Sequence, residues 1–368
     1  YGFLSENHEF AKKVQQKTKA KFIGPSPETI KLLGSKIDSR NLMIENNIPV
    51  LPGSSTPIKS ITELNKIAQD VKYPLMLKAS YGGGGRGIRV VSDPSELIKS
   101  YEECKREAKN YFGNDEVFCE KYIKEPRHIE IQILCDQHKN TIHLLERECS
   151  VQRKHQKIIE EAPSCLLNQQ DRNYLGELAI KIASASKYEG VGTCEFIYEK
   201  PNHIYFMEMN TRIQVEHPVT EMITGFDLVK AQLRIALGMP MTLNQSDINF
   251  RGHAIECRIN AEDSVNFIPN PGKITRMHIP GGFGIRYDSH IYNGYEVPPF
   301  YDSMLAKIIS LAGSRKSAIK RMLSALDEFF IEGINTTHQF HQKMLKDEKF
   351  IENKHTINYL ENEFLKNA

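Results

Sequence analysis

Two glutamates that a hairpin can place face to face are the first chemical signal in this chain. If Glu199 pairs with Ile204, a four-residue loop from Lys200 to His203 remains, and Glu195 then faces Glu208 across the hairpin. Direct partners of this kind lie roughly 4.5–5.5 Å apart at Cβ. Two bare carboxylates at that distance repel each other, so the pattern favours a divalent cation between them. The alternative is a slipped register with two solvated surface glutamates.

The residues after this hairpin add polar groups at close spacing. Residues 208–217 read EMNTRIQVEH, which combines amides, a guanidinium and further carboxylates. A carboxylate base beside cationic side chains is suited to deprotonating a small oxyanion. Residues 152–157, QRKHQK, supply a second dense set of donors suited to phosphate or a small anion, although alone they would describe an ordinary charged loop.

A glycine-rich loop lies between two predicted strands, 73–78 and 88–91. Residues 81–87 read YGGGGRG and formally contain G-x-G-x-x-G. A dinucleotide-binding loop would open a helix, a Walker A loop would end in Lys-Ser or Lys-Thr, and the HRD and DFG motifs of protein kinases are absent. The segment instead predicts a flexible flap whose backbone N–H groups approach phosphate oxygens. An ordinary mobile hairpin is the alternative, weakened by four successive glycines.

Length and composition describe an ordinary globular protein. The 368 residues are 40% hydrophobic and 26% charged, with a net charge of +2, which allows two or three subdomains. This balance argues against a nucleic-acid or membrane-surface binder, and no apolar run approaches the roughly 18 residues of a membrane span. Seven scattered cysteines without a CxxC pair favour reduced thiols and a cytoplasmic location. The opening YGFLSEN lacks an initiator Met and a signal-peptide pattern, so we expect a cut chain.

Alternating strand-like and helix-like segments predict a mixed α and β fold. Ser26-Pro27-Glu28 is typical of a helix start, with Ile30, Leu33 and Ile37 following at helical spacing. Further helices are expected from Asp93-Pro94 onward and over 169–187, 219–237 and 317–330. The strand over 128–134 places His128, Glu130 and Gln132 on one face, which lines a site or meets water. Short strands and Gly/Pro turns past Arg251 indicate a subdomain boundary.

Taken together, these segments resemble the biotin carboxylase component of acetyl-CoA carboxylase, an ATP-grasp enzyme. The resemblance covers essentially the whole chain and includes FIGPSPETI, LKASYGGGGRG, EKYIKEPRHIEIQ, QRKHQKIIEEAP, EMNTRIQVEHPVTEMITG, RGHAIECRINAED and PGGFGIRYDSHIY. The glycine loop and EMNTRIQVEHPVTEMITG are specific for biotin-dependent carboxylases, but they separate acetyl-CoA, propionyl-CoA and pyruvate carboxylases poorly. Tyr81 stands where the family usually has glycine, which predicts a stiffer hinge for the loop.

The resemblance implies an α+β class, namely an ATP-grasp fold with a mixed C-terminal subdomain. Residues 1–34 would be the remnant of an N-terminal nucleotide-fold subdomain, residues 35–250 the ATP-grasp domain and residues 251–368 the C-terminal domain. Because most of the N-terminal subdomain would be missing, we expect reduced activity and a disturbed homodimer contact, which the family forms near Phe283 and Arg286.

The resemblance also implies roles for individual residues. ATP would be bound by Lys36, Lys78, Gly82, Gly83, Gly84, Gly85, Gly87, Glu120, Lys121, Ile123, His128, Gln152, His155, Ile197 and Ile357. Magnesium or manganese would be held by Glu195 and Glu208, with Asn210 close by. Bicarbonate would be bound by Lys157, Arg212, Gln214 and Val215. Glu216 would be its general base, and Arg258 would steady the ureido oxygen of biotin.

The implied reaction is carboxylation of biotin by ATP and bicarbonate through carboxyphosphate, as the first half-reaction of acetyl-CoA carboxylase in fatty acid synthesis. The chain contains no biotinyl-lysine motif of the Met-Lys-Met type, so we expect the biotin on a biotin carboxyl carrier protein, with carboxyltransferase subunits as further partners. Three alternatives stay open. The chain could serve a propionyl-CoA or pyruvate carboxylase, it could be another ATP-grasp ligase forming an acyl or carbamoyl phosphate, or it could be a nucleotide-binding module without turnover.

Overall fold

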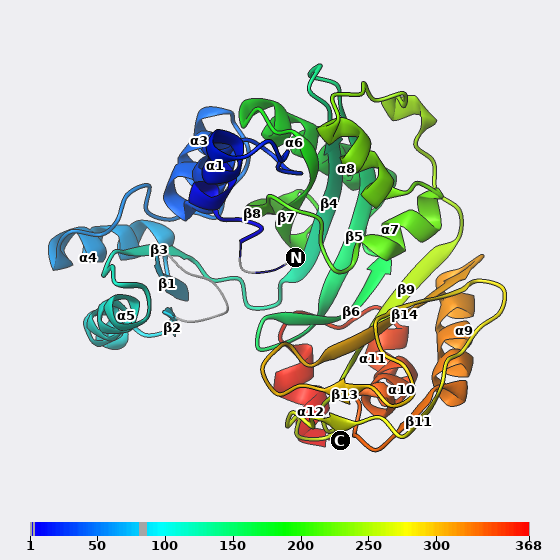
Figure 1. Ribbon diagram of the computed structural model, residues 1–368. Coiled ribbons are helices and arrows are strands. Elements are labelled where there is room, and N and C mark those ends of the chain that lie inside the picture. Colours follow the sequence, from blue (N-terminus) through cyan, green and yellow to red (C-terminus); the bar gives the residue numbers. More distant parts are fainter. Residues whose placement is uncertain (1, 3, 81–86, 368) are drawn as a thin grey trace.

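An eight-stranded antiparallel sheet runs through the centre of the molecule (Figure 1). The computed structural model describes residues 2, 4–80 and 87–367. The strand order in this sheet is β12-β14-β9-β6-β5-β4-β7-β8. Its strands are β4 (Arg127–Cys135), β5 (Thr141–Arg153), β6 (Gln156–Ala162), β7 (Gly190–Lys200), β8 (His203–Asn210), β9 (His253–Asn260), β12 (Ile285–Ser289) and β14 (Met304–Ala312).

A separate three-stranded sheet forms the small lobe at the left of Figure 1. Its order is β2-β1-β3, from β1 (Leu75–Ala79), β2 (Ile88–Val91) and β3 (Val117–Lys121). Two helices complete its core, α4 (Ile61–Val71) and α5 (Leu97–Phe112), the latter preceded by the short 3-10 turn η1 (Pro94–Glu96). The predicted strand at 88–91 is confirmed, so the glycine-rich segment leads into a strand and not a helix.

The N-terminal part contains three helices. The two that follow Ser26 take the place of the one continuous helix that the sequence predicted there. The three helices are α1 (His8–Lys17), α2 (Pro27–Gly34) and α3 (Lys36–Glu45). Ser26 caps α2 by accepting a hydrogen bond from the Thr29 amide, as predicted. Ser35 then takes an extended conformation and caps α3 in the same way. The expected single helix is therefore wrong at Ser35, and Lys36 becomes the first residue of a new helix.

Three helices pack on the central sheet beside β4, β5 and β7. The helix α6 (Gln169–Ala185) contributes Leu175, Ala179 and Ile182 to the core against β4 and β7. The predicted helix over 219–237 is instead two helices, α7 (His217–Thr224) and α8 (Leu228–Ala236). The break lies at Gly225, whose φ of 72° ends α7 in a left-handed cap that glycine adopts without strain.

The C-terminal part extends the same sheet instead of building a separate one. Strand β9 pairs with β6, so hydrogen bonds cross the boundary expected at Arg251. Four short strands form two-stranded pairs, β10 (Gly272–Lys273) with β13 (Glu296–Val297) and β11 (Arg276–His278) with β15 (Phe330–Glu332). The remaining elements are η2 (Gln245–Asp247), α9 (Arg315–Glu328), α10 (His338–Lys346), α11 (Glu348–Ile351), the π-helical turn η3 (Leu360–Phe364) and α12 (Leu365–Asn367).

All seven cysteines are free thiols, and six of them are buried. Within the described part of the chain, no helix is both long and apolar enough to cross a lipid bilayer.

Candidate functional site

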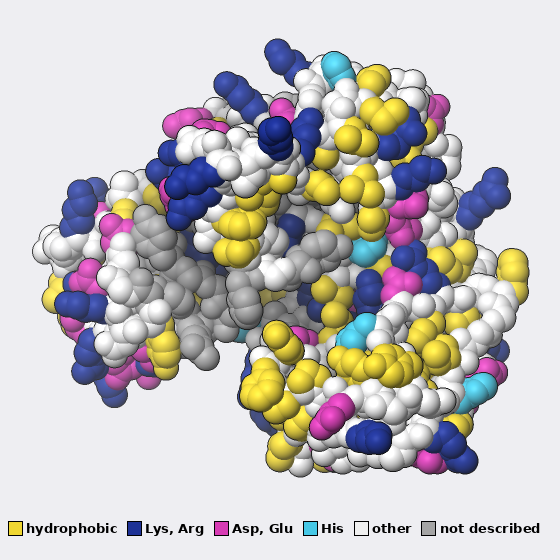
Figure 2. All heavy atoms as spheres, viewed as in Figure 1, with side chains coloured by type: hydrophobic (Ala, Val, Ile, Leu, Met, Phe, Trp, Pro, Cys, Tyr) yellow, Lys and Arg dark blue, Asp and Glu magenta, His cyan; other side chains and the backbone are white. Residues whose placement is uncertain are grey.

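A cavity of about 530 Å³ lies where the small lobe, the central sheet and the C-terminal part meet. Figure 2 shows the molecule hollowed between the lobe at the left and the part at the lower right. The cavity is lined by nineteen of the residues expected to act: Lys36, Lys78, Glu120, Lys121, Ile123, His128, Gln152, His155, Lys157, Glu195, Ile197, Glu208, Asn210, Arg212, Gln214, Val215, Glu216, Arg258 and Ile357. Residues spread over more than 300 positions of sequence are thus brought together.

The glycine loop is the part of the expected site that stays untested. Gly82, Gly83, Gly84 and Gly85 lie outside the described residues. Gly87 is described, with a φ of 66°, and its carbonyl accepts a hydrogen bond from the Ala79 amide at 2.8 Å. This glycine lies directly before β2 and is not among the residues that line the cavity.

The facing glutamates are confirmed, although the path between them differs from the prediction. Glu195 on β7 is the direct cross-strand partner of Glu208 on β8. The predicted pairing of Glu199 with Ile204 is wrong, because Tyr198 pairs with Ile204 and Lys200 with His203. The loop therefore has two residues instead of four. The strand register shifts by one residue before the intervening pairs and shifts back after them. The two shifts cancel, so the two carboxylates still face each other.

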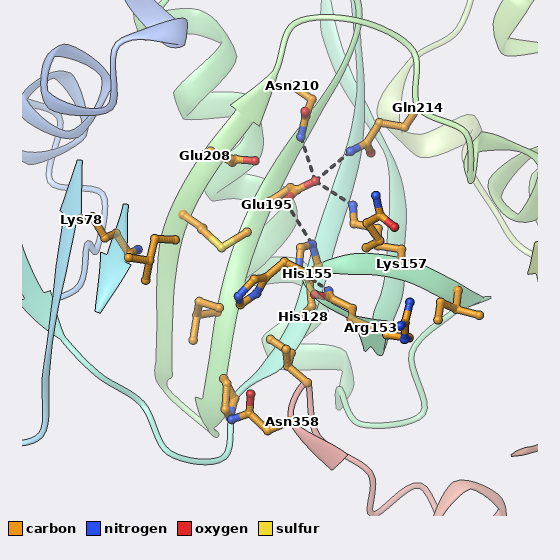
Figure 3. Close-up of a pocket in the computed structure, with 18 of the residues that line it drawn as sticks. Lys78, His128, Arg153, His155, Lys157, Glu195, Glu208, Asn210, Gln214 and Asn358 are labelled. Atoms are coloured by element: carbon orange, nitrogen blue, oxygen red, sulfur yellow. Dashed lines mark hydrogen bonds and ion pairs between the residues drawn. The ribbon is translucent and has the colours of Figure 1, made fainter. Parts of the chain in front are cut away.

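Glu195 is surrounded by donors, as Figure 3 shows. Its Oε1 accepts from Lys157 at 2.7 Å, from the Asn210 amide at 2.8 Å and from the Gln214 amide at 2.8 Å. His128 Nε2 lies 3.2 Å from Oε2. Burial alone would raise the pKa of Glu195, but the positive charges of Lys157 and His128 hold it below its usual range. This carboxylate is therefore ionised at neutral pH.

Glu208 lies on the same face of the hairpin and borders the open cleft. Its side chain is exposed, so the cleft walls displace only part of the water around the carboxyl; this partial burial and then the negative charge of Glu195 raise its pKa. Two carboxylates and the amide oxygen of Asn210 are hard oxygen donors, the type that Mg²⁺ and Mn²⁺ prefer. The donor chemistry thus fits a divalent cation.

Lys157 binds three buried carboxylates at once. Its Nζ lies 2.5 Å from Glu130, 2.7 Å from Glu195 and 2.7 Å from Glu216. Burial would lower the pKa of Lys157, but the three negative charges raise it well above its usual range. This ammonium group therefore stays charged in the cavity wall.

The polar face of β4 does not meet water, and its contacts continue beyond the cavity into the interior of the sheet. Glu130 and Gln132 are fully buried, and both bind Arg147 of β5, at 2.5 Å and 2.6 Å. Arg147 also donates to Gln214 at 2.9 Å. No role was predicted for Arg147 from the sequence. The alternation in 128–134 indicated a polar face on this strand, but it could not show that a buried residue of the next strand binds that face.

Glu216 lies between two cations. Its Oε1 accepts from Lys157, and its Oε2 accepts from Arg258 Nη2 at 2.9 Å. Burial would raise the pKa of Glu216, but the charges of Lys157, Arg258 and Arg147 together lower it. Lys307 donates to the Val215 carbonyl at 2.7 Å and so fixes the backbone directly before Glu216. Arg258 also donates to Glu160 at 2.6 Å, a contact that the sequence analysis did not foresee.

Arg212 is anchored by a residue far away in sequence. Glu6 accepts from Arg212 Nε at 3.0 Å and from the Thr211 amide at 3.0 Å. Arg212 Nη2 donates to Asn210 Oδ1 at 3.1 Å. No sequence pattern pointed to Glu6, because 205 residues separate it from Thr211.

The nucleotide side of the cavity combines cations with an apolar wall. Lys78 donates to Glu120 at 2.6 Å from the neighbouring strand of the small sheet. Burial and then the charge of Lys78 lower the pKa of Lys36. Lys121 donates to the carbonyls of residues 72 and 73 instead of reaching freely into the cavity. The apolar lining includes Ile123, Ile197 and Ile357, joined by Met76, Phe206 and Met207, to which the sequence analysis gave no role.

His128, Gln152 and His155 meet at one end of the β5–β6 hairpin. Gln152 Nε2 lies 3.1 Å from His128 Nδ1, and His155 lies in the turn that joins the two strands (Figure 3). Burial would lower the pKa of His128, but the charge of Glu195 and the contacts with the Glu130 and Glu195 carboxylates together raise it to about 9. The donor cluster expected over 152–157 is therefore the tip of a hairpin that reaches into the cavity.

Three family models match the chain in succession. They are described as biotin carboxylase, N-terminal domain, over residues 1–30, carbamoyl-phosphate synthase L chain, ATP binding domain, over residues 35–244, and biotin carboxylase C-terminal domain, over residues 256–362.

Individual relatives agree with these models. A biotin carboxylase from Haemophilus influenzae is 50% identical over 362 residues, covering 98% of this chain and 80% of the relative. The structure of a biotin carboxylase–β,γ-ATP complex from Campylobacter jejuni superposes with a TM-score of 0.94 at 46% identity. The match covers 98% of this chain and 80% of that one. The biotin carboxylase domain dimer of the Hydrogenobacter thermophilus 2-oxoglutarate carboxylase, with magnesium ADP, ADP and bicarbonate, gives 0.93 at 48% identity and the same coverage.

Proposed function

This chain belongs to the biotin carboxylase family of ATP-dependent ligases, and on that basis we propose that it carboxylates biotin with bicarbonate and ATP through carboxyphosphate. The observation that carries the proposal is Glu216, a buried carboxylate held between Lys157 and Arg258 in the cavity wall. Arg212, Gln214 and Val215 line the same part of the cavity. This is a base beside cations, as removal of a proton from an anion requires.

The first step forms carboxyphosphate. Bicarbonate would lie against Lys157 and Arg212, whose charges favour the anion and its deprotonated form. Glu216 takes the bicarbonate proton, the freed oxygen attacks the γ-phosphorus of ATP, and the bond to the ADP oxygen breaks. We place Mg²⁺ or Mn²⁺ at Glu195 and Glu208, with Asn210 close by, where the ion would offset charge on the phosphates when bound.

The nucleotide would lie along the wall shared by the small lobe and the central sheet. Lys36, Lys78 and His155 supply positive or donor groups for its phosphates, and Ile123, Ile197 and Ile357 enclose an apolar slot for adenine. Glu120, already bound by Lys78, is placed to accept from the adenine amino group or a ribose hydroxyl. Lys121, His128 and Gln152 complete the proposed ATP set.

The second step moves the carboxyl group to biotin. Carboxyphosphate separates into CO₂ and phosphate, phosphate takes the proton from N1′ of biotin, and N1′ attacks CO₂. Negative charge develops on the ureido oxygen when N1′ loses its proton. Arg258 lines the cavity beside Glu216 and is the guanidinium placed to stabilise that charge.

Three wider features belong to the proposal. The domain limits at 34/35 and 250/251 are supported by family models that cover 35–244 and 256–362. A homodimer contact near Phe283 is supported by the 93% exposure of that side chain. The carrier-bound biotin, the carboxyltransferase partner and the acetyl-CoA carboxylase context follow from the family resemblance, and the proposed cytoplasmic location follows from the scattered cysteines. The chain is 46–50% identical both to biotin carboxylases and to a 2-oxoglutarate carboxylase, so the identity does not select one carboxylase. The alternative is therefore that this chain serves a propionyl-CoA or pyruvate carboxylase.

The test is ADP formation with magnesium, bicarbonate and free biotin, each omitted in turn. We expect turnover that needs bicarbonate, rises with biotin and is lost in Glu216→Gln. Glu199→Gln at the exposed end of the β7–β8 hairpin is the matched control and should keep full activity. ADP formation that ignores bicarbonate and survives Glu216→Gln would overturn the proposal. ATP binding without any turnover would instead support a nucleotide-binding module.

A further inference from the structure

Two buried carboxyls lie side by side next to Arg258 and have no role in the mechanism above. Glu160 on β6 is the direct cross-strand partner of Glu256 on β9. Such partners share a face of the sheet, with Cβ atoms roughly 4.5–5.5 Å apart. Both side chains are fully buried.

These two carboxyls are nearly without partners. Glu160 Oε1 accepts from Arg258. Among the described residues, Glu160 Oε2 and both oxygens of Glu256 have no hydrogen-bond partner. An ionised carboxylate buried without a partner costs several kcal/mol, and two like charges at this spacing add repulsion. The pair therefore cannot hold two negative charges at neutral pH at reasonable cost.

The charged groups around the pair do not change this conclusion. Lys307 of β14 is the nearest candidate for Glu256, but its Nζ donates to the Val215 carbonyl and lies 3.7 Å from Asp288. The other groups that face the pair are Arg258 on β9, Lys157 on β6, Glu216 before α7, and the thiols of Cys149 and Cys257. Lys157 is bound by Glu130, Glu195 and Glu216. Arg258 binds Glu160 and Glu216 together, so its single positive charge is shared between the pair and Glu216.

We propose that Glu160 and Glu256 hold one proton between them and so present a single negative charge to Arg258, which makes the pair the positioning device for this guanidinium. Arg258 then bridges two carboxylates of opposite function, Glu160 in the wall and Glu216 in the cavity. With one proton on the pair, the pull of Glu160 is balanced by that of Glu216, and the guanidinium stays beside the cavity. Loss of the proton would draw Arg258 into the wall.

The direction of titration supports this picture. Burial raises the pKa of Glu256 well above its usual range against the opposing charge of Lys307, and the neighbouring Glu160 charge raises it further. Burial raises the pKa of Glu160 to about 7, against the opposing charge of Arg258. The two groups titrate as a pair, and the first proton to bind belongs to both.

The proton itself can be tested without any assay of turnover. At about pH 8 the infrared spectrum of the native protein should contain a carboxylic-acid C=O band that Glu256→Gln lacks, because Glu160 alone with Arg258 is ionised there. A folded group with a raised pKa stabilises below its unfolded pKa, and that stability is lost as pH rises through the folded pKa. The Tm of the native protein should therefore fall more steeply between about pH 6 and about pH 9 than that of Glu256→Gln.

The control is Glu332→Gln on β15, an exposed carboxylate paired with Arg276. This variant should leave both the C=O band and the alkaline fall of the Tm unchanged. An identical C=O band in the native protein and Glu256→Gln, with parallel Tm curves, would overturn the proposal.

The consequence for turnover rests on the proposed function. In the native protein the KM for free biotin should rise several-fold as the pair loses its proton at alkaline pH, at saturating ATP and bicarbonate. Glu256→Gln should lack that rise, which a merely structural role would not remove. An alkaline rise of equal size in both proteins would overturn the positioning role. Absence of biotin-dependent turnover in every protein would count against the proposed function, while the infrared and Tm results still decide the proton.

Discussion

Two groups of buried carboxylates in one sheet differ in how they are paired. On β4 and β7, Glu130 and Glu195 are ionised because Arg147 and Lys157 lie within hydrogen-bond distance. Two strands away, Glu160 and Glu256 share a single cation, Arg258. Burial acts on all four in the same direction, towards the neutral acid. The partner, and not the depth of burial, therefore decides the charge of each group.

This difference matters for chemistry as well as for charge. The paired group keeps fixed negative charges beside the cavity, where the proposed metal ion and general base need them. The sparsely paired group can bind or release a proton near neutral pH, and it acts on the cavity only through Arg258.

The largest effect is expected where a partner is removed from the fully paired group. Arg147→Met leaves Glu130 without the guanidinium that binds it and leaves the amide oxygens of Gln132 and Gln214 without their donor. Breaking a buried pair in this way costs about 3–5 kcal/mol. Urea unfolding should show that loss in the free energy of unfolding. Arg276→Met, which removes an exposed pair with Glu332, is the control and should cost about 0.5 kcal/mol or less. A loss for Arg147→Met no larger than that of the control would break the contrast.

Removing the shared ammonium group should affect turnover most. Lys157→Met leaves Glu130, Glu195 and Glu216 without a common cation, and takes a positive charge from the proposed bicarbonate site. Loss of one such electrostatic contact lowers kcat by about 10²–10³-fold. The measurement is biotin-dependent ADP formation. Lys154→Met in the same hairpin turn is the matched control, because this exposed lysine does not line the cavity. Equal activity of the two variants would show that Lys157 only fills space.

A third prediction concerns acid pH and a paired carboxylate outside the cavity. Glu161 binds Arg315 at 2.6 Å and His253 at 2.8 Å. Burial would raise its pKa, but Arg315 and then His253 lower it below the usual range. A depressed folded pKa stabilises above the unfolded value and is lost as pH falls through the folded value. Glu161→Gln should cost about 2 kcal/mol at neutral pH, and its Tm deficit should shrink below about pH 4. A deficit that is constant with pH would contradict this sign.

The sequence was sufficient for those features of the site that depend on local order. The facing of Glu195 and Glu208 was predicted, since a hairpin sets its own register and two opposite register shifts cancelled. The helix break at Ser35 was missed, because its side chain caps a new helix where hydrophobic spacing suggested continuity. The helix end at Gly225 was also missed, although glycine is the usual residue after the end of a helix.

Features that depend on distant strands could not be predicted. Glu160 and Glu256 are 96 residues apart, and their pairing follows from the placing of β6 beside β9. Arg147 lies on a strand whose partner was recognised only as a polar alternation. The family resemblance supplied nineteen cavity residues, but it did not show which of their carboxylates have partners.

The smallest effect is expected at Glu6, where a pair is open to water. Its contact with Arg212 has exposed side-chain fractions of 40% and 29%, and such pairs contribute about 0.5–1 kcal/mol. Glu6→Gln keeps the acceptor for the Thr211 amide but removes the charge beside Arg212. Because Arg212 is proposed to bind bicarbonate, its looser anchoring should raise the KM for bicarbonate by about 2–5-fold and leave kcat nearly unchanged. Glu9→Gln, three residues further along the chain and paired with His8, should change neither value. A fall in kcat for Glu6→Gln with unchanged KM would instead place Glu6 in the chemical step, and the contrast between buried and open pairs would then not describe this site.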